Sequence, residues 1–233
     1  MTAEKTCATT DCRLLPTVER QKGEFPKCAI LWLHGLGADG HDFEPIVDEF
    51  DFDQLPAIRF VFPHAPMRPV TINGGYAMRA WYDILALEGV RREDEAGLRQ
   101  SMAQVLALVQ REVARGVPAH RIVLAGFSQG CAMTLLAGLR CAQRLAGLAG
   151  LSGYLPLATT TAAEANPANR DVPVFMAHGS RDEVVSPERG RSSRDQLQAL
   201  GYTVEWHEYP MEHSVCIEEV RALQAFLRRV LAG

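Results

Sequence analysis

A serine flanked by glycines lies near the middle of the chain. Residues 126–130 read G-F-S-Q-G, with Ser128 at the centre. They follow the apolar run Ile122–Ala125 and open an apolar stretch, so a strand must turn sharply into a helix with Ser128 at the tip. Glycines on both sides remove the Cβ atoms that would collide in such a turn. The pattern indicates a nucleophilic serine; the alternative is a glycine-rich turn with an inert serine.

A serine hydroxyl is a weak nucleophile until a base accepts its proton. In sites built on this kind of turn, the acid and the histidine follow the serine along the chain. His207 lies inside the predicted strand Thr203–Tyr209, where its side chain points to a face of the sheet. His213 lies just past that strand, and catalytic groups in open parallel sheets gather at the carboxyl ends of the strands. We therefore expect His213 to be the base.

The acid is expected at the end of the apolar run Val174–Ala177. Asp182 and Glu183 both follow that run within a few residues. Asp182 stands at the usual distance after a glycine turn, whereas Glu183 is expected to project into solvent. We expect Asp182 to orient His213 through its Nδ1–H group and to stabilise the imidazolium.

A negative charge that develops on a substrate oxygen needs hydrogen-bond donors. The main-chain N–H of Gln129, which directly follows the serine, is the first candidate. The second is expected from the loop after an early strand, and we assign it to the N–H of Leu36, just past the apolar run Ala29–Leu33. His34 lies in the same loop and is expected to brace it by hydrogen bonds rather than to act as a second base.

Short apolar runs alternate with longer amphipathic stretches along the chain. Runs that are apolar on both faces are typical of strands buried between two layers of helices. The predicted strands are Ala29–Leu33, Ile58–Phe62, Ile122–Ala125, Ala146–Leu151, Val174–Ala177 and Thr203–Tyr209, with Leu14–Arg20 as the candidate edge strand. The predicted helices are Asp42–Phe50, Leu98–Arg115, Gln129–Arg140, Pro187–Leu200 and Val215–Leu231. This alternation predicts an α/β fold with a mainly parallel sheet, helices on both faces, and long loops over Pro63–Gly97 and Pro156–Asp171.

The composition is that of an ordinary globular protein. The 233 residues carry 24 Lys and Arg against 28 Asp and Glu, a net charge of −4 that argues against a general nucleic-acid surface. The polar N-terminus has no secretory signal, and no apolar run is long enough to span a bilayer, so we expect a cytoplasmic protein. We expect a flexible N-terminal extension over residues 1–13 and a single domain over residues 14–233.

The remaining candidate ligands do not favour a metal site. The six cysteines include no C-x2-C pair, and reduced thiols are expected without an export signal. His41, His64, His120 and His178 have no common spacing and are expected to be surface or loop residues. Asp39 and Asp42 flank His41 but are weak evidence for metal binding, and nothing selects the two-carboxylate chemistry of glycosidases.

Several blocks together resemble the phospholipase/carboxylesterase family, which includes acyl-protein thioesterases and small bacterial carboxylesterases. They are residues 33–40 (L-H-G-L-G-A-D-G), residues 81–84 (W-Y-D-I), the G-F-S-Q-G segment, His178-Gly179 with Asp182, and His213. The blocks stand in the family's order and cover nearly all of residues 28–220. Residues 73–76 (N-G-G-Y) look like the bacterial carboxylesterase branch.

The resemblance implies an α/β-hydrolase fold, a Ser128–Asp182–His213 triad, an oxyanion hole from the amides of Leu36 and Gln129, and no cofactor. It also implies an acyl-binding groove, for which the candidate lining residues are Met78, Trp81, Leu87 and Tyr154; ordinary core packing is an equal alternative for these four. Tyr154 stands where some relatives carry Trp, which leaves the preferred chain length open. Family members often pair, so a homodimer is a further expectation.

We expect a serine carboxylesterase that hydrolyses short- to medium-chain carboxylic esters through an acyl-enzyme. Acyl-protein thioesters and lysophospholipids need the same machinery and remain alternative substrates. A different class of function is a binding module that keeps this fold with a vestigial site, although nucleophile, base, acid and oxyanion donors all have candidates in the chain.

Overall fold

The computed structural model describes residues 14–52, 55–85 and 93–232. Within these residues, seven strands form one sheet in the order β1-β3-β2-β6-β7-β8-β9. Neighbouring strands are parallel except for β1, which runs antiparallel to β3 at one edge. The strands are β1 (Thr17–Lys22), β2 (Cys28–Leu33), β3 (Ile58–Pro63), β6 (Ile122–Phe127), β7 (Gly147–Leu151), β8 (Val174–Gly179) and β9 (Val204–Tyr209). The predicted α/β fold with a mainly parallel sheet is confirmed.

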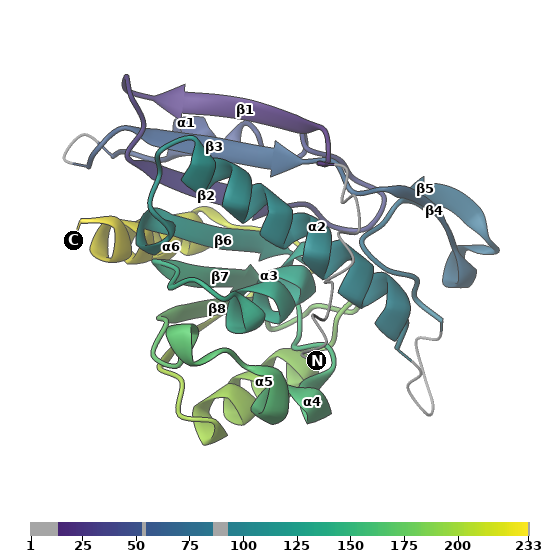
Figure 1. Cartoon of the computed structure of the whole chain (residues 1–233). Coiled ribbons are helices and arrows are strands. Elements are labelled where there is room, and N and C mark those ends of the chain that lie inside the picture. The colour runs from purple at the N-terminus through teal and green to yellow at the C-terminus, as the bar shows by residue number, and fades with distance from the viewer. Residues whose placement is uncertain (1–13, 53–54, 86–92, 233) are drawn as a thin grey trace, which may run out of the picture.

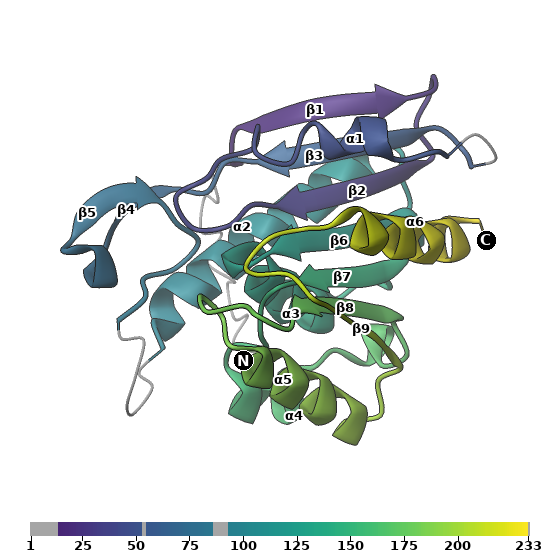
Figure 2. The ribbon, with the colours of Figure 1, turned by 180° about the vertical axis from the view of Figure 1, so that it is seen from behind.

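Helices cover both faces of this sheet. Figure 1 shows α2 and α3 in front of the sheet, and Figure 2, from behind, shows α1 and α6 on the opposite face. In β2, Leu31 and Leu33 join the core beneath α2 and α3, while Ile30 and Trp32 join the core beneath α1 and α6. This alternation explains why the central strands are apolar at every position. The helices are α1 (Ile46–Glu49), α2 (Glu95–Ala114), α3 (Gln129–Arg140), α4 (Ala158–Glu164), α5 (Pro187–Ala199) and α6 (Ile217–Leu231).

Three segments differ from the sequence-based prediction. The helix expected over Asp42–Phe50 shortens to the single turn of α1, which buries only Ile46 and Val47. The expected loop Pro63–Gly97 contains the antiparallel hairpin β4 (Met67–Val70) and β5 (Tyr76–Arg79), which projects beyond the carboxyl ends of the parallel strands (Figure 1). Short strands that pair only with each other leave little periodicity in a sequence.

The expected loop Pro156–Asp171 was also wrong, because it contains α4 and a 3-10 turn over Pro167–Asn169. Its alanines favour a helix, but seven residues are too few to form one without tertiary support. That support comes from Arg99 and Arg140, which both bind the Glu164 carboxylate at the end of α4. Ion pairs between distant segments are not visible in a local pattern.

Within the described ranges, no helix combines the length and the apolar character that crossing a bilayer would need.

A buried carboxylate fastens α2 to the edge of the sheet. Glu112 is fully buried and lies 2.7 Å from the guanidinium of Arg59 on β3. Arg111 and Arg115 approach the same carboxylate at 2.9 and 3.0 Å and also bind Glu19 on β1. The cluster therefore ties one helix to the edge strand β1 and to its neighbour β3.

Replacement of Glu112 by alanine should lower the free energy of unfolding by about 3–5 kcal/mol, because it leaves the buried Arg59 without its partner. The matched control is Glu95→Ala, which removes an exposed ion pair with Arg99 from the same helix and should cost less than about 1 kcal/mol. Urea denaturation measures both; equal effects would contradict the importance of the buried cluster.

A second buried carboxyl group makes stability depend on pH. Glu219 in α6 is fully buried, and burial raises its pKa from 4.5 to about 8. Between these two values the unfolded chain releases the proton while the folded protein keeps it, so the stability contribution present below pH 4.5 is lost as pH rises. Compared with Glu219→Gln, the wild type should lose up to about 1.4 kcal/mol per pH unit in this window. Urea midpoints of both proteins at pH 5 and pH 8 provide the measurement, and parallel pH profiles would disprove it.

Candidate active site

Ser128 lies at a strained turn between β6 and α3. Its backbone has φ 57° and ψ −117°, a conformation that a non-glycine residue adopts only when its surroundings enforce it. The surroundings are very close: a Cβ atom on Gly130 would lie 1.9 Å from the carbonyl oxygen of Leu33, and one on Gly126 would lie 2.4 Å from the backbone of Gly130. The glycines therefore allow α3 to start directly against β2 and β6, with Ser128 at the tip.

The structure brings Ser128, His213 and Asp182 into one line of hydrogen bonds. His213 Nε2 lies 3.0 Å from Ser128 Oγ, and His213 Nδ1 lies 2.7 Å from Asp182 Oδ2. Because a carboxylate only accepts, Nδ1 carries the proton and Nε2 is free to accept the hydroxyl proton of Ser128. This arrangement can activate the serine as a nucleophile.

The loop that carries His213 is anchored on the end of β8. The N–H of Ser180 donates to the carbonyl oxygen of Tyr209 at 2.7 Å, and the N–H of Arg181 donates to that of Met211 at 3.1 Å. A Cβ atom on Gly179 would lie 2.4 Å from the Met211 carbonyl oxygen. The glycine before Asp182 thus lets the two loops pack together, which sets the distance between the acid and the base.

Asp182 is buried, and both of its carboxylate oxygens have hydrogen-bond partners. The main-chain N–H groups of Val184 and Val185 donate to its Oδ1 at 2.9 and 2.8 Å, which leaves Oδ2 for His213. Its neighbour Glu183 is exposed, as the sequence suggested.

His178 was wrongly expected on the surface: it is fully buried in β8, and its Nε2 lies 2.8 Å from the Val185 carbonyl oxygen and 3.3 Å from Asp182 Oδ2. Burial lowers the pKa of His178.

The competing histidine His207 lies away from the serine. Its ring stacks on Phe175 at a centroid distance of 5.1 Å, and its Nε2 lies 2.9 Å from a carboxylate oxygen of Glu205. Phe175 and Glu205 lie near the starts of β8 and β9, away from the carboxyl ends of these strands. His207 therefore lies on a face of the sheet, as its position inside a strand predicted.

Two main-chain amides near Ser128 are free to receive an oxyanion. The N–H groups of Leu36 and Gln129 take no part in the backbone hydrogen bonds found among the described residues. Gln129 is the first residue of α3, so its N–H has no acceptor within the helix. The loop of Leu36 is held by the next residue, Gly37, whose N–H donates to the Arg79 carbonyl oxygen on β5 at 2.9 Å.

His34 braces the loop that presents Leu36, as the sequence indicated. Its Nδ1 donates to the Gly35 carbonyl oxygen at 2.7 Å, and its Nε2 accepts the N–H of Ala65 at 3.0 Å. Burial lowers the pKa of His34 to about 4, so the ring is neutral at physiological pH and can fill both roles. Both nitrogens are engaged, which leaves no free nitrogen for a second base.

The side chain of Gln129 and the indole of Trp81 connect the two amides, a link that the sequence did not reveal. Gln129 Oε1 accepts the main-chain N–H of Trp81 at 3.0 Å, and Gln129 Nε2 donates to the Tyr82 carbonyl oxygen at 2.9 Å. Trp81 Nε1 donates to the His34 carbonyl oxygen at 2.9 Å. The sequence features that could have indicated this link are the glutamine directly after the serine and the W-Y-D-I block at residues 81–84.

An apolar cavity opens beside Ser128. It encloses about 800 Å³, including the part open to solvent, and its wall includes both Leu36 and Gln129. His213 does not belong to the wall that the described residues form. The apolar and aromatic residues of the wall are Leu36, Ile72, Tyr82, Ile84, Leu85, Tyr154, Val184 and Val185.

The four residues proposed to line the acyl groove take different positions. Tyr154 lines the cavity, and its hydroxyl lies 2.7 Å from that of Tyr82. Trp81 is fully buried in the core, and Met78 lies in a shallow hollow with Gly37, so neither lines the cavity beside Ser128. Leu87 lies outside the described residues.

Comparisons with known proteins agree with this geometry. Residues 16–231 match the family model described as phospholipase/carboxylesterase. An acyl-protein thioesterase 1 from Neurospora crassa is 42% identical over 224 residues, which span 92% of this chain and 89% of the relative. A protein of the same name from Gibberella zeae is 43% identical over 211 residues, 87% of this chain and 90% of the relative.

Solved structures are similar over almost the whole chain. Arabidopsis thaliana SOBER1 has a TM-score of 0.83 and 32% identity, covering 88% of this chain and 99% of its own. Zea mays acyl-protein thioesterase 2 has a TM-score of 0.83 and 30% identity, covering 93% and 99%. With the serine turn, the parallel sheet and the family match on one chain, the protein is a carboxylic ester hydrolase that belongs to the phospholipase/carboxylesterase family of α/β-hydrolases.

Proposed function

We propose that the protein is a thioesterase of the acyl-protein type, in which Ser128, His213 and Asp182 are the catalytic triad. The observation that carries the proposal is the hydrogen-bonded line from Ser128 Oγ through His213 to Asp182, at the mouth of an apolar cavity. The curated relatives named acyl-protein thioesterase support the substrate class.

The first step is attack of Ser128 Oγ on the carbonyl carbon of the thioester. His213 Nε2 takes the hydroxyl proton while Asp182 stabilises the imidazolium that forms. The carbon–sulfur bond then breaks, the thiol leaves with the proton, and Ser128 holds the acyl group as an ester. A water molecule, deprotonated by His213, attacks that ester and releases the fatty acid and the free serine.

The amides of Leu36 and Gln129 form the oxyanion hole in this proposal. Leu36 and Gln129 line the same cavity as Ser128, and the loop of Leu36 is fixed by His34 and Trp81 before substrate arrives. Donors that are already oriented cost no reorganisation when charge develops on the oxygen, and each is typically worth about 10²–10³ in turnover.

The position of the cavity assigns the two halves of the substrate. Leu36, Ser128 and Gln129 line the cavity, so a carbonyl carbon at Ser128 with its oxygen on the two amides directs the acyl chain into it. The leaving group must face His213, because it receives the proton from Nε2. His213 is partly exposed at that point, so a peptide bearing the thiol can remain outside the cavity.

A short- to medium-chain carboxylesterase, which the sequence favoured, is the second candidate. The same triad and cavity cleave oxygen esters, and the matched family model names carboxylesterases together with phospholipases. Thiol leaving groups are less basic than alcohols and leave more readily. The relatives at about 40% identity support the thioester as the preferred substrate.

Wild-type protein and Ser128→Ala can be compared on an S-octanoyl cysteine peptide and on the matched octanoyl serine peptide. We expect the wild type to have the higher kcat/KM on the thioester, and Ser128→Ala to lose about 10⁴ or more in kcat on both. A higher kcat/KM on the oxygen ester would instead favour the carboxylesterase. Equal rates of wild type and variant, together with no labelling of wild type by a fluorophosphonate probe, would contradict both enzymatic candidates.

Asp182→Asn should lose about 10⁴ in kcat, because an amide cannot hold His213 in the tautomer that accepts the serine proton. The matched control is Glu183→Gln, which changes the exposed neighbouring residue and should keep kcat within about twofold. Steady-state kinetics on the octanoyl thioester provide the measurement. A loss below tenfold in Asp182→Asn would assign the orienting role to another acid.

A further inference from the structure

Three residues form a wall that the apolar cavity shares with a second hollow. Glu93, Tyr154 and Arg189 line the cavity beside Ser128 and also line a neighbouring hollow between α4 and α5. The second hollow has a mixed lining: Thr159 and Ser192 are polar, whereas Leu155 and Ala158 are apolar. The wall therefore separates the mainly apolar cavity from a hollow of mixed lining.

An arginine stacked on a tyrosine forms the centre of this wall. The guanidinium carbon of Arg189 lies 3.5 Å from the centre of the Tyr154 ring, and the Tyr154 hydroxyl lies 2.7 Å from that of the buried Tyr82. The Nε–H of Arg189 is buried and meets no acceptor among the described residues. Since arginine stays protonated, a permanent positive charge lies where the apolar cavity ends.

Hydrogen bonds through Ser193 connect the backbone on both sides of the stack. Ser193 Oγ donates to the Arg189 carbonyl oxygen at 2.7 Å and accepts the N–H of Leu155, next to Tyr154, at 2.8 Å. Ser193 is buried, so α5 and the segment that carries Tyr154 are held together at this point. The Arg189 side chain, rather than the backbone, is therefore the part of the wall that can be removed.

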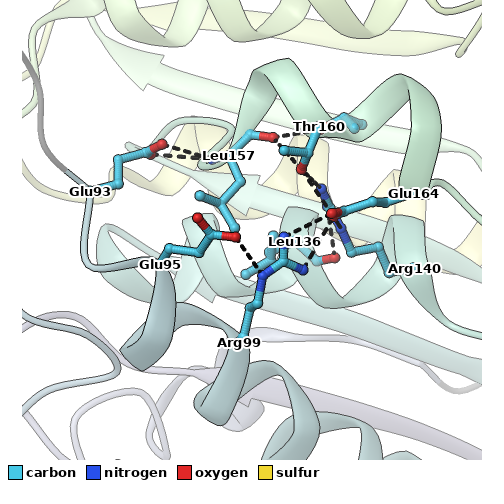
Figure 3. A network of polar contacts seen from close by, with 9 residues as sticks. Glu93, Glu95, Arg99, Leu136, Arg140, Leu157, Thr160 and Glu164 are labelled. Carbon is cyan, nitrogen blue, oxygen red and sulfur yellow. Dashed lines mark hydrogen bonds and ion pairs between the residues drawn. The ribbon is translucent and has the colours of Figure 1, made fainter.

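The third side of the wall is fixed by the network in Figure 3. The Glu93 carboxylate accepts the N–H of Leu157 at 3.1 and 3.2 Å, just before α4. Behind it, Arg99 and Arg140 each approach Glu164 at 2.7 Å and hold the end of α4 against α2 and α3. Glu93 is thus tied to a rigid helix, and its carboxylate is oriented by the backbone.

We propose that the Arg189–Tyr154 stack is a partition that limits the length of the acyl chain, a role that rests on the thioesterase function proposed above. A chain that ends before the stack is buried in an apolar space. A longer chain must displace the guanidinium or strip it of water, and burying an unpaired charge is costly. The partition therefore favours medium chains over long ones by penalising only the chains that reach it.

The test is a series of butyryl, octanoyl and palmitoyl thioesters below their aggregation concentrations, with wild type, Arg189→Ala and Arg189→Met. Each methylene that a chain newly buries is worth up to about fourfold, so access to two more raises the palmitoyl-to-octanoyl ratio of kcat/KM by up to about sixteenfold. We expect this rise in both variants, with kcat/KM for the butyryl thioester within about twofold of wild type, since a short chain does not reach the wall.

The matched control is Glu188→Ala, which changes the preceding residue in the same helical turn. Glu188 lines the outer hollow but not the cavity at Ser128, so the palmitoyl-to-octanoyl ratio should stay at the wild-type value. If Arg189→Ala and Arg189→Met hydrolyse the butyryl thioester normally and keep the wild-type ratio, the partition is wrong. If wild type hydrolyses no ester or thioester of the series, the proposed function fails instead.

Discussion

The contact between the start of α3 and the end of β2 is the constraint on which the rest of the site depends. With no side chain at Gly130, the backbone of α3 approaches the Leu33 carbonyl oxygen so closely that any Cβ atom would overlap it. At this close approach Ser128 takes its positive φ of 57°, and α3 begins directly after it at Gln129. The strain, of order 1–3 kcal/mol, persists because the sheet core on both sides surrounds the turn.

The two candidate oxyanion donors come from separate strands, and buried polar groups hold them in register. Leu36 follows β2, and Gln129 follows β6, which pairs with β2 in parallel. The Gln129 side chain binds the main chain of Trp81 and Tyr82, and the Trp81 indole binds the His34 carbonyl oxygen. A buried donor without an acceptor costs about 1–3 kcal/mol, so this closed set of hydrogen bonds favours a single arrangement of the loop. The precision of the donors thus comes from residues that do not contact the substrate.

Acid, base and cavity wall are arranged around the same two strand ends. Asp182 and Arg189 both follow β8: the first is buried and bound to His213, and the second lies in the wall that the cavity shares with the neighbouring hollow. The short stretch between them, with Val184 and Val185, donates both amides to Asp182 and also contributes to the cavity wall. One loop therefore connects the orientation of His213 with the shape of the cavity beside Ser128.

The sequence determined the parts of the protein that rest on local geometry. Buried strands of a parallel sheet are apolar on both faces, and the serine turn needs glycines at fixed spacing, so the sheet and Ser128 were predictable. His213 and Asp182 followed from chain order and from their places just past strands. The hairpin β4–β5 was missed because its two short strands pair only with each other, and α4 was missed because the distant residues Arg99 and Arg140 hold it in place.

Only the tertiary structure decided which side chains surround the cavity beside Ser128. Trp81 turned into the core as a brace, Tyr154 turned toward the cavity, and the burial of His178 beside Asp182 had no local signal. The stack of Arg189 on Tyr154 joins a residue in the first turn of α5 to a residue in the loop after β7. Local patterns report the side of a strand or helix on which a residue lies, whereas a cavity wall depends on how loops that are distant in the chain meet in space.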